Sequence, residues 1–361
     1  MTLLITRFAL GGAETQAVRV AARLARRGWE VELAALFGGD AFARELSAAG
    51  VTARSLRSAA GVASFVRRTR ARRPQALVAF LYHPTLFAAA VGRLLGVPVI
   101  SSIRDPIFGK HRRLSVVRAL MRHGLVDRLV ANSSEVAHKL VKKDRFPRAQ
   151  VEHVPNAIDI ALVDSDVGAR EHVRASLGLA AEHFVWLAVG NYVQPEKDYP
   201  TLISAFERVA ARRSDARLMT CGRGTMSASL LARIDTLGGR VKVLGERNDV
   251  PALLAACDAF VLSSSTEGMP NAVLEALAAG RPVVSTRVGA VPEMIEDAVT
   301  GVLCAPRDPE MLSEKMLVMM AMDAGGRERL GRAARASVEA RYSVDAIVDR
   351  WERLIGGAEE R

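Results

Sequence analysis

Two glutamates near the end of the chain have the spacing of a ligand site. Glu267 and Glu275 lie eight positions apart in Glu267-Gly268-Met269-Pro270-Asn271-Ala272-Val273-Leu274-Glu275. The apolar run 258–262 before them is typical of a buried parallel strand, which predicts Glu267 in the loop at that strand's carboxyl end. Pro270 suits a first helical position and Gly280 the residue after a helix end, so Glu275 is predicted in the first turns of a helix.

This placement indicates the chemistry of the ligand. Ligands of open α/β sheets bind at the carboxyl ends of the strands. A helix N-terminus that points there attracts phosphate, whereas two carboxylates repel phosphate and accept hydrogen bonds from hydroxyls. A molecule that carries both sugar hydroxyls and a diphosphate would bind to the carboxylates and to the helix N-terminus at once. The segment therefore predicts a nucleotide-sugar site.

Other chemistries fit less well. The loop with Gly11 and Gly12 follows the first predicted strand, where glycine permits close approach to a ligand or simply a tight turn. It lacks the third glycine of a dinucleotide fingerprint, and no Walker A or Gly-x-Ser-x-Gly sequence occurs. If Glu267 and Glu275 were a glycosidase pair, they would have to lie on opposite sides of the glycosidic bond that is cleaved. Two residues of one short loop-helix segment are poorly placed for this. The alternative to a ligand site is that Glu267 and Glu275 are solvated acids at the start of a helix, where the helix dipole favours negative charge.

Composition sets the frame. The chain has 361 residues, half of them apolar, which is enough for two domains with their own cores. Three widely separated cysteines and no dense histidine cluster predict no disulfide scaffold and no metal site, and they fit a reducing compartment. We expect no secretory signal, and the most apolar stretch, 76–91, is too short and interrupted to span a bilayer.

Positive charge is concentrated in the first half. The chain carries +11, yet residues 1–165 contain 26 Lys and Arg against 12 Asp and Glu. Basic clusters occur at 67–73 and at 110–113, the second followed by Arg118 and Arg122 beside an apolar stripe. Such clusters fit a solvated surface helix or an anionic membrane surface. Aromatic interleaving and nucleic-acid-binding motifs are absent, so no nucleic-acid partner is expected.

Strand-like runs alternate with helical patterns along the chain, which predicts parallel sheets covered on both faces. The runs before the polar stretch 154–170 are 3–8, 30–36, 76–81, 97–102, 127–131 and 150–154. Those after it are 185–189, 216–220, 241–244, 259–262 and 282–285. We expect two Rossmann-like domains, 1–165 and 166–342, facing a central cleft. A last helical segment, 343–361, is expected to pack back on the first domain.

Six segments, in order, resemble glycosyltransferase family 4. They are Gly11-Gly12-Ala13-Glu14, Val154-Pro155-Asn156-Ala157-Ile158-Asp159, Val189-Gly190 with Pro195-Glu196-Lys197-Asp198-Tyr199, Val243-Leu244-Gly245, the Glu267–Glu275 segment, and Val288-Gly289-Ala290-Val291-Pro292-Glu293. The likeness covers most of the chain and is strongest in its second half. It implies the α/β GT-B fold and a retaining glycosyltransferase that needs no metal and no cofactor.

The resemblance also implies residue roles. Lys197 would neutralise the leaving diphosphate, and Glu267 would accept hydrogen bonds from the transferred sugar. Glu275 would bind the ribose hydroxyls, and the backbone near Gly245 would contact the base. The remaining donor-binding residues implied are Gly11, Gly12, Gly190, Asn191, Arg223, Gly268, Met269, Pro270 and Asn271.

The sequence departs from the family pattern at three positions. Asn191 stands where the family often has arginine, so Arg223 or Arg104 would have to complete the phosphate clamp. Ser102-Ile103-Arg104-Asp105 replaces the usual histidine segment, and His83 is then a candidate for the acceptor pocket or a structural histidine. Ala157 in place of glycine predicts a stiffer hinge.

We therefore expect a hexosyltransferase that uses a nucleotide sugar, with UDP as the favoured nucleotide. Its expected acceptor is a lipid-linked saccharide or another envelope glycan precursor, and its catalytic residues would be Glu267, Lys197, His83 and Arg104. We expect it in the cytoplasm, peripherally bound to the inner face of the cell membrane. The alternatives are a nucleotide-sugar epimerase or hydrolase of the same fold, and a catalytically inactive GT-B binding subunit.

Overall fold

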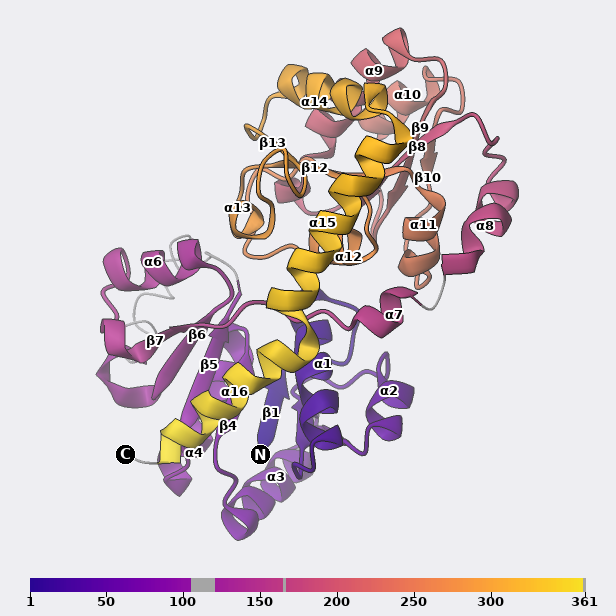
Figure 1. Ribbon diagram of the computed structural model, residues 1–361. Coiled ribbons are helices and arrows are strands. Elements are labelled where there is room, and N and C mark those ends of the chain that lie inside the picture. The colour runs from indigo at the N-terminus through magenta and orange to yellow at the C-terminus, as the bar shows by residue number, and fades with distance from the viewer. Residues whose placement is uncertain (105–120, 165–166, 360–361) are drawn as a thin grey trace. The chain divides into compact units, whose positions relative to one another are not determined.

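The chain folds into two compact units, each built around a parallel sheet (Figure 1). This computed structural model describes residues 1–104, 121–164 and 167–359. Unit 1 comprises Met1–Ala157 with Tyr342–Arg361, and unit 2 comprises Ile158–Arg341. The first boundary falls before the predicted position at 165. No helix in the described ranges is long and apolar enough to cross a membrane.

Unit 1 contains a seven-stranded parallel sheet in the order β3-β2-β1-β4-β5-β6-β7. The elements are β1 (Thr2–Ile5), α1 (Gly12–Arg26), β2 (Glu32–Ala35), α2 (Ala43–Ala48), β3 (Thr52–Ser55), α3 (Ala59–Arg72), β4 (Leu77–Phe80), α4 (Tyr82–Leu95), β5 (Val99–Ile103), a π-helical turn (Met121–Leu125), β6 (Arg128–Ala131), α6 (Ser134–Lys142) and β7 (Val151–His153). The six strands predicted here are confirmed. The edge strand β3 was not predicted, because its four residues are all exposed and carry no apolar pattern.

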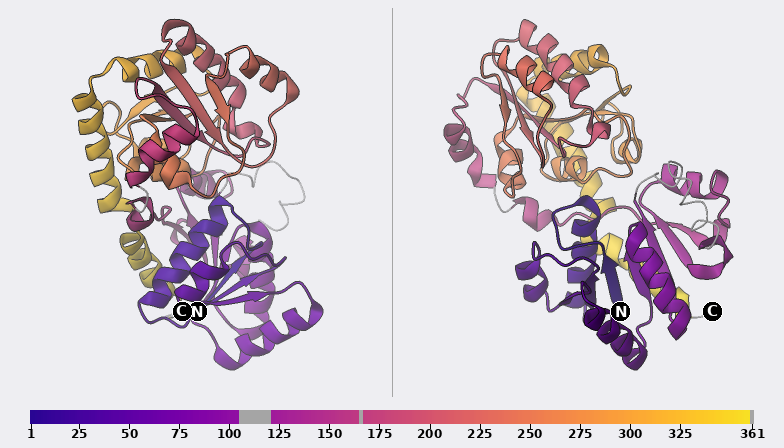
Figure 2. Two further views of the ribbon diagram at one scale, coloured as in Figure 1. Left: turned by 90° about the vertical axis from the view of Figure 1, so that its right-hand side faces the viewer. Right: turned by 180° about the vertical axis from the view of Figure 1, so that it is seen from behind.

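Unit 2 contains a six-stranded parallel sheet in the order β10-β9-β8-β11-β12-β13. The elements are α7 (Ile160–Asp164), α8 (Arg170–Ser176), β8 (Phe184–Val189), α9 (Tyr199–Arg212), β9 (Ala216–Cys221), α10 (Ala228–Asp235), β10 (Val241–Val243), α11 (Val250–Ala256), β11 (Ala259–Leu262), α12 (Asn271–Ala278), β12 (Val283–Thr286), α13 (Val291–Met294), β13 (Val302–Cys304), α14 (Pro309–Ala321) and α15 (Ala324–Tyr342). Five strands match the predicted runs, and the short β13 was missed. Helices lie on both faces of each sheet (Figure 2).

The C-terminal helix α16 (Val344–Glu359) packs against α1 of unit 1. Arg27 of α1 binds Asp349 at 2.5 Å and Glu352 at 2.8 Å. On its apolar face Trp351 is fully buried, and its ring lies 5.7 Å from that of Phe80 in β4. Helix α16 therefore contributes to the core of the first unit.

Both sheets have a topological switch point, where the chain order reverses between neighbouring strands. It lies between β1 and β4 in unit 1 and between β8 and β11 in unit 2. At such a point the loops that follow the two central strands run to opposite faces of the sheet, which leaves room for a ligand at the carboxyl edge. The predicted site segments follow these strands.

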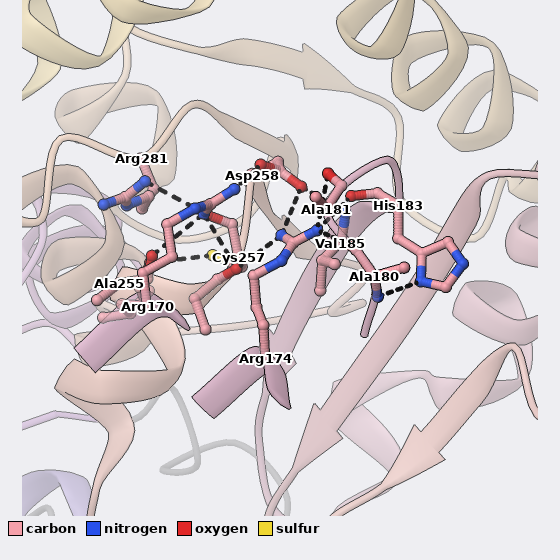
Figure 3. Close-up of polar contacts among 12 residues, drawn as sticks. Arg170, Arg174, Ala180, Ala181, His183, Val185, Ala255, Cys257, Asp258 and Arg281 are labelled. Carbon is pink, nitrogen blue, oxygen red and sulfur yellow. Dashed lines mark hydrogen bonds and ion pairs between the residues drawn. The ribbon is translucent and has the colours of Figure 1, made fainter. Parts of the chain in front are cut away.

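A cluster of arginines fastens the amino ends of β8 and β11 (Figure 3). Asp258, directly before β11, accepts a hydrogen bond from the backbone N–H of Val185 in β8 at 2.7 Å. It also binds Arg170 at 2.6 Å and Arg174 at 3.3 Å, both from α8. The same arginines donate to carbonyls at the end of α11, including that of Ala256. One carboxylate thus joins two strands to a helix.

We expect Asp258→Ala to lower the free energy of unfolding of unit 2 by about 2–3 kcal/mol, because it leaves Arg174, only 7% exposed, without its carboxylate. Asp215→Ala is the matched control, since the pair with Arg213 lies at the surface and surface pairs contribute under about 1 kcal/mol. Urea unfolding measures both, and equal losses would contradict this role of Asp258.

Candidate active site

The candidate site of unit 2 is built from the loops that follow β8 and β11. The two strands are paired, with Trp186 opposite Ala259. Beyond the strands the loops are joined by a backbone bond from Ser265 to the carbonyl of Glu196 at 2.7 Å. The hydroxyl of Ser263 donates to the carbonyl of Lys197 at 2.9 Å. These bonds fix two loops that are about 70 residues apart in the sequence against each other.

Lys197 and Glu267 form the centre of this site. The Nζ of Lys197 lies 2.7 Å from the Oε1 of Glu267, and their side chains are 20% and 12% exposed. The same Oε1 accepts a hydrogen bond from the hydroxyl of Ser264 at 2.7 Å. Ser264 is fully buried, and its carbonyl accepts the hydroxyl of Thr286 at 2.7 Å. An ammonium and a carboxylate are therefore held side by side at the switch point.

Glycines bring the backbone of neighbouring loops into contact beside Lys197. A Cβ at Gly190 would meet the Cδ of Lys197 at 3.0 Å, so the aliphatic part of the lysine lies over this glycine. A Cβ at Gly222, after β9, would collide with the carbonyl of Gly190. Gly222 also donates its N–H to the carbonyl of Gly245 at 2.8 Å. Only glycine permits these three loops to approach so closely.

Two tyrosines support the same loop. Tyr199, at the start of α9, donates its hydroxyl to the carbonyl of Gly190 at 2.6 Å. Its ring packs edge-on against that of Tyr192, with the centroids 5.1 Å apart. Burial raises the pKa of Tyr199, so its phenol remains a hydrogen-bond donor at neutral pH. No role for these tyrosines or for Ser264 followed from the sequence, although all three lie close to residues that were expected to bind the donor.

Helix α12 begins at the same edge. It starts at Asn271, with Pro270 as the residue before the first turn, one position later than predicted. Glu275 lies within α12 and is half-buried. Gly289 approaches the carbonyls of Glu267 and Gly268 so closely that a Cβ there would collide with both. Ala290 donates to the carbonyl of Gly268 at 2.7 Å, which fixes the loop that carries Glu267.

The remaining residues expected to bind the donor in this unit follow β8, β9, β10 and β11. The backbone N–H of Arg223 donates to the Oδ1 of Asn191 at 3.4 Å, and the Arg223 side chain is exposed. Gly245, with a φ of +70°, adopts a left-handed conformation after β10. Met269, in the loop before α12, is buried. The structure thus brings Gly190, Asn191, Lys197, Arg223, Gly245, Glu267, Gly268, Met269, Pro270, Asn271 and Glu275 to the carboxyl edge of one sheet.

In unit 1, the predicted residues follow β1, β4 and β5. Gly11 precedes α1 and Gly12 is its first residue, while His83 lies exposed in the first turn of α4. Arg104 is only 8% exposed. Its guanidinium lies 4.7 Å from the ring of Phe80 and donates to the side-chain oxygen of Asn156. Burial lowers the pKa of Arg104 to about 9, so it is still charged at neutral pH.

Nothing in the described ranges gathers three His, Cys, Asp or Glu side chains that would hold a metal ion. The three cysteines, Cys221, Cys257 and Cys304, are free and buried. Burial raises the pKa of each thiol, to about 11 or 12, so they remain protonated and unreactive at neutral pH.

The chain matches two sequence families. Residues 10–162 match the family described as Glycosyltransferase Family 4, and residues 183–322 match Glycosyl transferases group 1. N-acetyl-alpha-D-glucosaminyl L-malate synthase of Bacillus anthracis is 28% identical over 60% of this chain and 55% of its own length. GDP-mannose-dependent monoacylated alpha-(1-6)-phosphatidylinositol monomannoside mannosyltransferase of Corynebacterium glutamicum is 31% identical over 56% of this chain and 55% of its own. The chain spans about half the length of the curated relatives it matches.

Solved structures have the same fold. Anabaena Alr3699/HepE, crystallised with UDP and glucose, superposes with a TM-score of 0.86 at 21% identity, covering 99% of both chains. WaaG, described as a glycosyltransferase involved in lipopolysaccharide biosynthesis, gives a TM-score of 0.75 at 19% identity, covering 99% of this chain and all of the other. The predicted fold class, two Rossmann-like parallel sheets of the GT-B type, is confirmed.

We expect Gly222→Ala to destabilise unit 2 by about 2–3 kcal/mol, because the added methyl group would force the Gly190 backbone away from β9. Gly325→Ala, in the first turn of α15, is the control, since its nearest neighbours stand at 3.5 Å or more. The control should change stability by under about 1 kcal/mol. Urea denaturation of both variants is the measurement, and a Gly222→Ala protein as stable as the control would refute the tight approach.

Proposed function

Because the chain belongs to glycosyltransferase family 4, we propose that it transfers a hexosyl unit from a nucleotide sugar to an acceptor, with retention of the anomeric configuration. The observation that carries this proposal is the position of Lys197 and Glu267, 2.7 Å apart at the switch point of unit 2. An ammonium suits a diphosphate and a carboxylate suits sugar hydroxyls. A nucleotide sugar carries both groups next to the bond that is broken.

Each donor residue has a role in this proposal. Lys197 and the N–H groups at the start of α12 stabilise the leaving diphosphate, and fixed positive charge of this kind favours departure of the phosphate. Arg223, exposed after β9, replaces the arginine that the family often has at the position of Asn191. Glu267 binds the hexosyl hydroxyls and Glu275 the ribose. The leaving phosphate helps to deprotonate the acceptor hydroxyl on the same face of the sugar.

The donor nucleotide in the proposal is UDP. Support comes from Anabaena Alr3699/HepE, whose structures hold UDP and UDP-glucose. The Corynebacterium relative, by contrast, is named as GDP-mannose-dependent. The base would lie against the backbone near Gly245, which any purine or pyrimidine can contact. Binding of both nucleotides must therefore be measured.

We place the acceptor on unit 1, at the edge with Gly11, Gly12 and the exposed His83. The acceptor class is a lipid-linked saccharide or an envelope glycan precursor, in line with the phosphatidylinositol mannoside in the name of one relative. Arg104 is buried against Phe80 and Asn156, so we assign it to holding the strand ends in place.

Transfer of labelled sugar to extracted membrane lipids tests the function. Lys197→Ala and Glu275→Ala should each lower kcat/KM about 10- to 150-fold, because a charge-assisted hydrogen bond contributes ~1.5–3 kcal/mol. Glu207→Ala, which removes a surface carboxylate paired with Arg233, is the control and should keep full activity. Normal kinetics in both site variants would overturn the donor-site assignment. Turnover of the donor without an acceptor would instead indicate an epimerase or hydrolase.

We also propose peripheral binding to anionic membranes through α3. Arg68 and Arg72 of α3 are paired with Glu32 and Glu30. Arg67 and Arg70 of α3, and Arg73 directly after it, are exposed. Arg67 and Arg70 are three residues apart and so lie near one face of the helix, and Arg73 is its C-cap residue. A lipid-linked acceptor would require such a surface.

The second basic cluster contributes less to this argument. Residues 110–120 lie outside the described ranges. The Arg122 guanidinium is partly buried and donates to the carbonyl of Asp144 at 3.5 Å. The sequence indicated a free surface charge at this position, and the structure does not have one there. The α3 residues are therefore the better test.

Replacing Arg67, Arg70 and Arg73 with Gln should release the protein from anionic vesicles at low salt, because each basic residue near such a surface contributes about 1 kcal/mol. High salt should release the unmodified protein in the same way. Cosedimentation with phosphatidylglycerol vesicles is the measurement, and nucleotide affinity is the control. Equal sedimentation of both forms would favour a soluble acceptor.

A further inference from the structure

Glu267 occupies an unusual position for a carboxylate in a phosphate-binding site. Its Oε1 lies 2.7 Å from the Nζ of Lys197, the group proposed to attract the diphosphate. A carboxylate at that distance offsets the ammonium charge at any third group nearby. Taken alone, Glu267 therefore weakens the attraction of Lys197 for a phosphate.

The surroundings hold Glu267 in this arrangement. Ser264, fully buried, donates to the same Oε1, and Thr286 fixes Ser264 through its carbonyl. Lys197 and Ser264 thus both donate to the same oxygen of Glu267, Oε1. No donor from the described residues reaches the other oxygen, Oε2, which is left to accept hydroxyls.

We propose that the Lys197–Glu267 pair makes the donor site discriminate against free nucleoside diphosphate, and that Ser264 is the positioning residue for Glu267. This inference rests on the proposed function. A nucleotide sugar offsets the cost of the carboxylate, because its hexosyl hydroxyls donate to Oε2. A bare nucleoside diphosphate has no such hydroxyls and meets only the diminished charge of Lys197. The pair thus favours substrate binding and product release together.

Isothermal titration with UDP, UDP-glucose, GDP and GDP-mannose tests the discrimination. Glu267→Gln keeps the shape of the side chain and removes the charge. It should bind the nucleoside diphosphate about tenfold more tightly than the unmodified protein, the equivalent of ~1.4 kcal/mol, and the nucleotide sugar no more tightly. Glu207→Gln, at a surface ion pair in the same unit, should change neither affinity. Unchanged or weaker binding of the nucleoside diphosphate by Glu267→Gln would overturn the inference.

A double-mutant cycle tests whether Glu267 acts through Lys197. In a Lys197→Met background, Glu267→Gln should alter nucleoside diphosphate affinity by less than about twofold, because the charge that it offsets is gone. A tenfold gain that persists in this background would mean that Glu267 repels the phosphates directly, which would refute the role of the pair.

Ser264→Ala tests the positioning role. The expected result is a weaker affinity for the nucleotide sugar, by about fivefold, a lower kcat, and an unchanged affinity for the nucleoside diphosphate. Ser285→Ala removes another fully buried hydroxyl, one that donates to a backbone carbonyl of β12, and is the control. A merely structural role would lower both affinities and the melting temperature alike, and this outcome would refute the assignment of Ser264.

Binding of the four ligands separates failure of the proposed function from failure of the inference. If the unmodified protein binds none of the four ligands, the proposed function fails and the inference with it. If it binds them and Glu267→Gln shows no gain for the nucleoside diphosphate, the inference alone fails.

Discussion

The pairing of β8 with β11 is the constraint on which the candidate site depends. The two strands are neighbours in the sheet although three α-helices, two strands and their loops separate them in the sequence. At their amino ends Asp258 binds the Val185 N–H and two arginines of α8. At their carboxyl ends the Lys197–Glu267 pair and the Ser263 hydroxyl join the two loops. A shift of either strand by one residue would separate the ammonium from the carboxylate.

The backbone around this pair is as constrained as the side chains. Gly222 lies against the carbonyl of Gly190, and Gly289 against those of Glu267 and Gly268. Tyr199 donates its hydroxyl to the same Gly190 carbonyl. A site that is to bind a flexible diphosphate gains affinity when its own groups are already ordered, since less conformational entropy is lost on binding. The glycines and the tyrosine supply this order without touching the charged groups.

Unit 1 shows a comparable arrangement at the end of its last strand. Gln16 of α1 exchanges two hydrogen bonds with the backbone of Ala157, at 2.9 and 2.6 Å. Asn156 holds Arg104, whose guanidinium lies over Phe80, and Phe80 in turn contacts Trp351 of α16. The segment that resembles the interdomain motif of the family is thus fastened to unit 1 up to Ala157.

The sequence by itself determined the two parallel sheets, eleven of their strands and the carboxyl-edge position of Glu267, because apolar runs and helix boundaries are local signals. Lys197 was identified through the resemblance of its loop to the family. The sequence did not reveal β3, which is exposed along its length, and it also missed β13. Strand order was decided by tertiary structure, and with it the contact between Lys197 and Glu267. Packing between distant segments also decides the burial of Arg104 and the partial burial of Arg122. The same holds for the support that Ser264, Thr286 and Tyr199 give to the site. Such contacts leave no periodic trace in the sequence, because each joins residues whose spacing is set by the fold alone.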